Sequence, residues 1–388
     1  MLREIIVFTP MNVTAFWALV FFSNRFHENK AKYWLGLFML VTALLYTCHA
    51  IFFHGYRDLY LKIDSLYVLS SLLVYPMYYI YIRLLTCDLT LHRLYIIHFL
   101  PAIVVSAFLL FFGQLITEEE EQLYYDYVLV RNEFPGGGVS FNLGTISAVF
   151  FMSRIIFGIQ TLYYLFLGYR LVQKYNRRIA NFYSNLEGRE LIWVKMLTVS
   201  FLITAIVSFI ANSLGRGVFI NNEIYLSVPA ILFSSLLFFI GIQGNKQDFN
   251  ISKFNEDEEN EIIDVKNALV PRNEKLKLSL LDLLENKKIY LNPELKITEL
   301  CRELNTNRTY LSNVINNDFQ LSFNDLINKY RIEYVILLIN NETHNQLSFQ
   351  YLAETSGFGS LSSFNRAFKK FKGITVGGYI DNKKQRGF

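Results

Sequence analysis

The chain has 388 residues, which is long enough for two or more domains, and its formal net charge is only +4. Hydrophobic residues make up 52% of it, aromatic residues 16% and charged residues 18%, which excludes an ordinary soluble protein. The apolar excess lies in residues 1–243, which hold 17 Lys and Arg, whereas the shorter remainder holds 20. Residues 1–243 therefore belong in a bilayer.

Seven apolar stretches in this first domain are each long enough to cross about 30 Å of hydrocarbon, which takes about 20 helical residues. They predict an all-α fold in which residues 1–243 form a polytopic bundle of seven transmembrane helices. The expected spans are Ile5 to Ser23, Trp34 to His54, Leu66 to Leu85, Leu94 to Ile116, Leu143 to Leu167, Trp193 to Leu214 and Ile224 to Gln243.

The loop charges predict an orientation, because Lys and Arg concentrate in the cytoplasmic loops of membrane proteins. With a cytoplasmic C-terminal part, the inner loops are residues 24–33, 86–93 and 168–192. These loops hold nine Lys and Arg, against five in the outer segments. We therefore expect the N-terminus outside the membrane. The long outer loop from Thr117 to Asn142 contains four consecutive glutamates and is interpreted as a solvated acidic loop.

One charged residue lies well inside an expected span. Arg154 is about a dozen residues into the fifth stretch, where a charge costs roughly 2.5 to 3.5 kcal/mol, so it is expected to face the bundle interior with a partner. The polar candidates for that partner are His49, Gln114, Gln160 and Asn212. Arg154, His49 and Asn212 are a possible intramembrane signal site, and a structural hydrogen bond between helices is an equal alternative.

No motif in the membrane part indicates catalysis, because HExxH, GxSxG and Walker-type patterns are all absent from the sequence. The three cysteines, Cys48, Cys87 and Cys301, lie far apart and form no CxxC pair. We therefore expect no enzyme activity, no cofactor and no metal site.

An acidic linker, residues 244–274, separates the two halves. It carries four basic and eight acidic residues, including the run EDEENE from Glu256 to Glu261. Such a run is interpreted as a solvated, flexible tether. The alternative is that the seventh span continues as a helix into Lys275 to Asn286, a short amphipathic segment that opens the last domain, residues 275–388.

One pattern occurs twice in this last domain. Ile297 to Ile315 and Ser348 to Phe371 each read as two short amphipathic helices joined by a tight turn. Leu300, Cys301, Leu311 and Ile315 of the first copy match Leu352, Ala353, Phe364 and Phe368 of the second. The second turn is one residue longer and contains Gly357, which suits a positive φ. Each copy predicts a helix-turn-helix unit whose second helix enters a major groove of DNA.

Between the copies, Ser322 to Ile339 predicts one helix, with Ser322 and Asp325 at capping-box spacing. A helix of this length, about 27 Å, is a strut that holds two recognition helices about one DNA turn apart.

These residues resemble the DNA-binding domain of the AraC/XylS family of bacterial transcription regulators. The resemblance is plainest in GFGSLSSFNRAFKKFKG from Gly357 to Gly373, and NRTYLSNVIN of the first copy supports it. The chain departs from the family where Phe319 and Gln320 replace a usual Gly and where Val376 replaces a usual Pro. By this resemblance, base contacts are expected from Thr309, Ser312, Asn313, Ser362, Asn365 and Arg366, and phosphate contacts from Arg308, Lys369 and Lys370.

The sequence thus predicts a transcription regulator of the bacterial cytoplasmic membrane, in which a seven-helix sensor is tethered to a double helix-turn-helix domain. Its expected partners are double-stranded DNA, membrane lipid, an unknown signal ligand or protein, and a second copy on DNA. Two alternatives stay open. The membrane part is a transporter or lipid-modifying enzyme with a regulatory tail, or it is an anchor only.

Overall fold

The computed structural model describes residues 2–23, 29–87, 93–220, 222–247, 251, 254–255, 273–341 and 348–385. Every regular element in these residues is helical, as the sequence predicts. The chain divides into two compact units. Unit 1 comprises Met1–Val172 and Leu191–Ile251, and unit 2 comprises Gln173–Glu190 and Ser252–Phe388.

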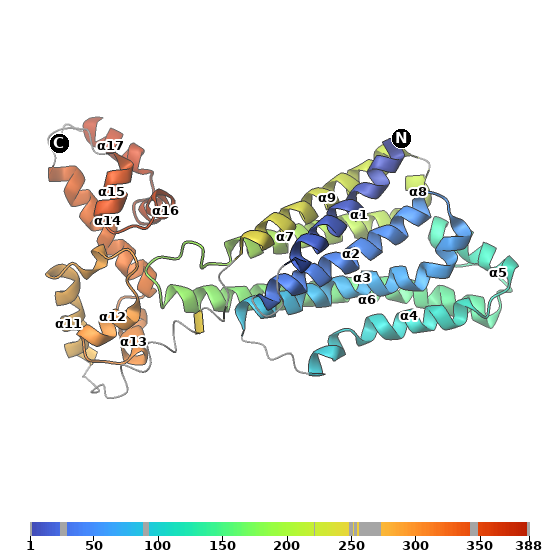
Figure 1. Cartoon of the computed structure of the whole chain (residues 1–388), viewed down its shortest axis with the longest axis horizontal. Coiled ribbons are helices and arrows are strands. Elements are labelled where there is room, and N and C mark those ends of the chain that lie inside the picture. Colours follow the sequence, from blue (N-terminus) through green and yellow to red (C-terminus); the bar gives the residue numbers. More distant parts are fainter. Residues whose placement is uncertain are drawn as a thin grey trace. The chain divides into compact units, whose positions relative to one another are not determined.

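Unit 1 is a helical bundle (Figure 1). Its elements are α1 (Leu2–Phe22), α2 (Lys30–Phe53), α3 (Arg57–Thr86), the 3-10 helix η1 (Arg93–His98), α4 (Leu100–Gly113), α5 (Glu118–Leu123), the π-helix η2 (Tyr124–Arg131), α6 (Phe141–Ala180, whose last residues enter unit 2), α7 (Ile192–Leu214), α8 (Gly217–Ile220) and α9 (Glu223–Lys246).

The prediction of seven spans is wrong in one place. Among the described residues, six helices are long and apolar enough to cross a membrane, namely α1, α2, α3, α6, α7 and α9. The fourth predicted stretch, Leu94 to Ile116, contains η1 and then α4, whose 14 residues extend only about 21 Å. Pro101 stands at the start of α4, where its missing N–H and fixed φ favour a new helix over a continuous one.

Ring contacts fix the relative direction of α3 and α6. Near the start of both helices, the guanidinium of Arg216 lies 5.4 Å from the ring of Tyr60 and 5.8 Å from that of Phe150. Further along both, the rings of Tyr79 and Tyr164 lie 5.5 Å apart. The two helices are therefore parallel, and the segment between them returns along the bundle through α4, which packs on α3.

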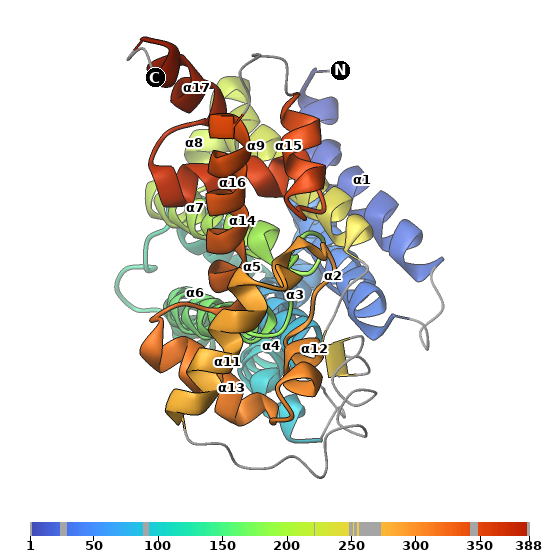
Figure 2. The same ribbon diagram turned by 90° about the vertical axis from the view of Figure 1, so that its left-hand side faces the viewer.

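Unit 2 contains the two predicted copies. It holds α11 (Asn273–Glu285), η3 (Ile289–Leu291), α12 (Ile297–Glu303), α13 (Arg308–Asp318), α14 (Phe323–Asn341), α15 (Phe349–Thr355), α16 (Leu361–Lys372) and α17 (Val376–Gln385). Figure 2 shows α11 to α13 at one end of α14 and α15 to α17 at the other. The eight apolar positions matched between the copies are all buried, which confirms the repeat.

Local sequence explains the helix boundaries in this unit. Side chains cap α13, α15 and α16, because Asn307, Ser348 and Ser360 accept hydrogen bonds from the backbone N–H three residues later. The Ser322 hydroxyl likewise accepts a 3.1 Å bond from the Asp325 N–H at the start of α14. The predicted strut, Ser322 to Ile339, is thereby confirmed and ends two residues later than expected.

The boundary between the halves differs from the sequence-based division. Residues 173–190, assigned above to an inner loop of the membrane part, belong to unit 2 together with the end of α6. The last long helix, α9, ends at Lys246, and Gln247 is extended, so this span does not continue directly as one helix. The acidic run from Glu256 to Glu261 lies outside the described residues.

Candidate nucleic-acid interface and membrane cavities

The first predicted recognition helix is α13. Its buried face consists of Leu311, Val314 and Ile315. Thr309 and Asn313, one turn apart on the other face, are exposed, and Ser312 is half-buried beside them. These three side chains therefore lie on one accessible stripe, as base contacts require.

The second predicted recognition helix, α16, is more strongly amphipathic. Phe364, Ala367 and Phe368 are buried against the second-copy core, whereas Ser362, Asn365, Arg366, Lys369 and Lys370 are all exposed. Lys369, Lys370 and Lys372 stand in the last turn, where positive charge also stabilises the helix dipole. This face is polar and basic, which is the composition that a phosphate-lined groove favours.

Positive φ occurs at two positions that the sequence singles out, Gly357 and Gln320. Gly357 in the second copy has a φ of +82°, and a Cβ there would lie 2.6 Å from the Leu291 carbonyl oxygen. The predicted requirement for glycine is confirmed. Gln320 stands where the AraC/XylS family usually has glycine. It takes a φ of 55°, so a non-glycine residue adopts the left-handed conformation at this position.

The loop between α6 and α7, residues 181–191, folds onto the helix-turn-helix repeats; we call it the α6–α7 loop. Tyr183 and Lys296 form an antiparallel bridge. The Ser184 N–H donates to the Leu295 carbonyl and the Ile297 N–H donates to the Phe182 carbonyl, both at 3.0 Å. The loop is thus hydrogen-bonded in register to the segment that begins the first copy.

A buried arginine joins the same loop to α14. Arg331 is 1% exposed, and its guanidinium donates to the carbonyls of Tyr290 (2.7 Å) and Asn292 (2.6 Å) and to the Ser184 hydroxyl (3.2 Å). Burial lowers its pKa to about 9, so it keeps its charge at neutral pH. The Asn324 amide, also on α14, donates to the Ser184 carbonyl at 2.6 Å.

The loop also carries an ion pair with the first copy. Glu294 accepts hydrogen bonds from Arg189 at 2.8 Å and from Asn185 at 2.9 Å. Burial raises the pKa of Glu294, but these hydrogen bonds together with the positive charges of Arg189 and Arg331 lower it, and the net pKa is below the usual value.

Two of the predicted DNA contacts are engaged by the α6–α7 loop. The Arg308 guanidinium lies 5.0 Å above the ring of Phe182. An Arg366 Nη1 lies 3.6 Å from a Glu190 carboxylate oxygen. Lys370, a predicted phosphate contact, instead pairs with Asp325 of α14 at 2.6 Å. The loop contacts could not be predicted from the sequence, because their partners are more than 100 residues apart.

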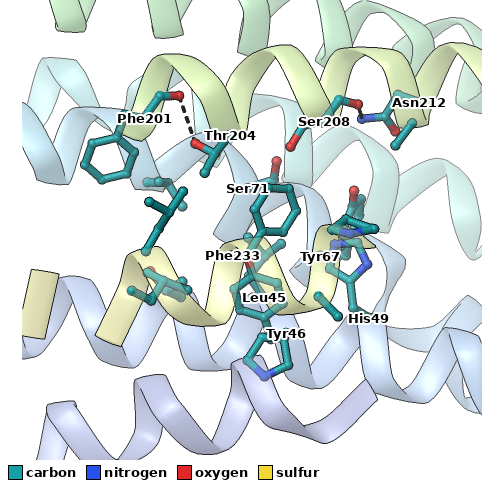
Figure 3. A pocket seen from close by; sticks show the side chains of 18 of the residues that line it. Leu45, Tyr46, His49, Tyr67, Ser71, Phe201, Thr204, Ser208, Asn212 and Phe233 are labelled. Atoms are coloured by element: carbon teal, nitrogen blue, oxygen red, sulfur yellow. Dashed lines mark hydrogen bonds between the residues drawn. The ribbon is translucent and has the colours of Figure 1, made fainter. Parts of the chain in front are cut away.

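In unit 1, a cavity of about 200 Å³ lies among α1, α2, α3, α7 and α9. His49 and Asn212, two of the three predicted signal-site residues, line it. Figure 3 shows Ser71, Thr204 and Ser208 reaching it from α3 and α7, with Tyr46 and Phe233 opposite. The cavity is thus mostly apolar with a few polar groups, as ligand cavities generally are.

Arg154 lines a second cavity, of about 760 Å³, between α3, α6 and α7. Tyr67, Ser71, Phe157 and Asn212 line both cavities, which therefore adjoin. Arg154 donates to the side chain of Asn132, which follows η2, and its guanidinium stacks 4.8 Å from the Phe150 ring. The partners suggested above for Arg154 are therefore incorrect, because the actual partner comes from the outer loop.

A buried polar cluster that the sequence did not indicate lies beside these cavities. Arg216 is 6% exposed and donates to the Tyr60 hydroxyl at 2.7 Å. The Tyr124 hydroxyl donates to Asp64 at 2.7 Å, and both residues are buried. Arg216 follows the sixth predicted span and is one of the five basic residues of the outer segments, and Asp64 lies just before the predicted third span. Only the tertiary structure brings them inside.

Comparison with known proteins supports the identity of unit 2. A family model described as "Helix-turn-helix domain" matches residues 300–382. A 91-residue segment is 29% identical to the "Uncharacterized HTH-type transcriptional regulator YtdP" of Bacillus subtilis (strain 168). That segment is 24% of this chain and 11% of the relative. No solved structure matches the chain. The C-terminal part of the chain is therefore an AraC-type helix-turn-helix domain, preceded by an apolar helical region.

Proposed function

We propose that the protein is a membrane-embedded transcription regulator that binds double-stranded DNA in the major groove and changes its DNA affinity in response to a signal bound in unit 1. The observation that carries this proposal is the α6–α7 loop, which contacts both Arg308 and Arg366. The base-reading and phosphate-contacting roles assigned above to α13 and α16 are part of it.

The proposed route from signal to DNA runs through α6 and α7. Both helices line both cavities, since Phe157 of α6 also lines the first. The α6–α7 loop joins their ends directly. A ligand that changes the spacing of these two helices changes the distance that the loop has to span, and a short loop transmits such a change to its contacts.

Loop contact and DNA contact compete for the same side chains in this scheme. Arg366 cannot bond a guanine edge in full while it faces Glu190, and Arg308 cannot reach a phosphate while it lies on Phe182. A signal that releases the loop therefore raises DNA affinity. A second copy in the same membrane is confined to a plane, which raises its effective concentration and favours a homodimer on repeated sites.

The test is Glu190→Ala in the full-length protein, reconstituted in lipid nanodiscs and titrated with the chromosomal fragment it binds best. Because the pair is partly exposed (51% for Arg366 and 20% for Glu190), its loss is expected to tighten binding by at most about fivefold, or about 1 kcal/mol. Glu187→Ala is the matched control, since Glu187 is exposed in the same loop. Equal effects of the two substitutions would contradict the proposed competition.

We further propose that the protein lies in the bacterial cytoplasmic membrane with its N-terminus outside and unit 2 in the cytoplasm. The positive loops and the parallel direction of α3 and α6 support this orientation, because a chain that returns between these helices through η1 and α4 would have its two ends on opposite faces. A periplasmic reporter inserted within Thr117 to Asn142 is then expected to be active, and one within Gly168 to Ile192 inactive. The reverse pattern would exclude DNA binding by this chain in the cell.

A further inference from the structure

The first cavity of unit 1 is lined by a buried cation. Arg216 lines it, and the guanidinium lies 4.6 Å from the rings of both Phe52 and Tyr67. Its Nη1 donates to the Tyr60 hydroxyl, but its buried Nη2 has no hydrogen-bond partner among the described protein groups. A buried donor of this kind costs free energy unless an acceptor reaches it.

The charged groups around the cavities do not balance. Arg216 and Arg154 each line one of the adjoining cavities, whereas Asp64 is the one carboxylate buried near them in the part of the chain that the structure describes. Asp64 is bonded to the neutral Tyr124, and Arg154 to the neutral Asn132. Two cations against one anion in an apolar bundle attract a further negative charge, because screening is weak there.

The other residues that line the first cavity favour a ligand with an apolar aromatic or aliphatic part. Tyr46, Phe201 and Phe233 contribute aromatic walls, and Ser71, Thr204 and Asn212 contribute hydroxyl and amide groups between them (Figure 3). A cavity of about 200 Å³ exceeds the roughly 150 Å³ that holds benzene in an engineered protein. A longer tail has room in the adjoining cavity, which is almost four times larger.

We propose that these cavities bind an organic monocarboxylate, with its carboxylate at Arg216 and its aromatic or aliphatic body between α2, α3, α7 and α9. This inference names the ligand class for the signal site and so rests on the proposed function. The same chemistry is available from two sources, a small aromatic acid from solution or a fatty acid from the bilayer.

The experiment uses the full-length protein in phosphatidylcholine nanodiscs and measures binding by calorimetry without DNA, so that its outcome does not depend on gene regulation. The probes are benzoate and laurate, each compared with its uncharged alcohol. At least one acid is expected to bind at least tenfold more tightly than its alcohol. Binding of benzoate alone identifies a soluble acid, and binding of laurate alone identifies a bilayer acid.

Arg216→Gln is expected to weaken acid binding at least tenfold and to leave alcohol binding unchanged. Arg131→Gln is the matched control, because Arg131 is exposed and stacks on Tyr127 at the outer end of η2. If Arg216→Gln does not fold, Asn212→Leu, which removes a polar group from both cavities, is expected to lower acid affinity. Acids that bind no better than alcohols, or acid affinity that neither substitution changes, would overturn the proposal. That result would refute the ligand class but not the proposed function, which the Glu190→Ala measurement tests separately.

Discussion

Replacing Arg331 by alanine is expected to destabilise unit 2 by about 3 kcal/mol, because buried groups lose a charged hydrogen-bond donor and a cavity forms. The Tyr290 and Asn292 carbonyls and the Ser184 hydroxyl all accept from this guanidinium. The loss is expected to fall on η3, α14 and the α6–α7 loop together. Hydrogen exchange of the full-length protein measures it segment by segment.

Lys329→Ala provides the control for this substitution, since Lys329 lies on the same helix and is exposed. It is expected to change exchange rates little. Faster exchange confined to α14 after Arg331→Ala, with the α6–α7 loop unaffected, would show that the arginine does not hold the loop in place.

Replacing Arg366 by alanine is expected to cost roughly 1 to 3 kcal/mol at the specific DNA site, because arginine can bond guanine through two donors at once. Binding to random DNA is expected to change little. Lys369 is an exposed neighbour on α16. Lys369→Ala is expected to weaken specific and random binding alike. It is also expected to reduce the slope of log affinity against log salt concentration by about one, the value for one lost phosphate contact.

Titration of both DNA types at several salt concentrations separates the two roles. Equal losses on specific and random DNA after Arg366→Ala would show that this residue contacts the backbone. Because Arg366 also faces Glu190, the measurement is best repeated in the Glu190→Ala background. A larger loss there is expected if the loop competes for the arginine.

The helix-turn-helix repeats could be predicted from sequence because their signals are local. A capping residue at Ser322, a glycine in the turn at Gly357 and an apolar period near 3.6 each act within one or two helical turns. The structure confirms the core positions they predicted. The DNA-contacting roles of α13 and α16 stay predictions, since they depend on a partner.

The membrane part was less predictable for two physical reasons. Hydropathy averages over a window, so it merged η1 and α4 into one span although Pro101 marks a new helix start. Tertiary contacts decide which polar groups meet, so neither Asn132 beside Arg154 nor Arg216 beside Tyr60 follows from spacing along the chain. The contacts of the α6–α7 loop with the helix-turn-helix repeats were unpredictable for the same reason.

The distance along the chain between Ser184 and Arg331 has a consequence for biosynthesis. The two residues are 147 positions apart and meet in the folded protein. At about 5 to 20 residues per second, the ribosome completes the loop roughly 7 to 30 s before it completes α14. The helix-turn-helix repeats therefore emerge with the loop already made and tethered to them. The contacts between the loop and the repeats can therefore form as soon as α14 has folded.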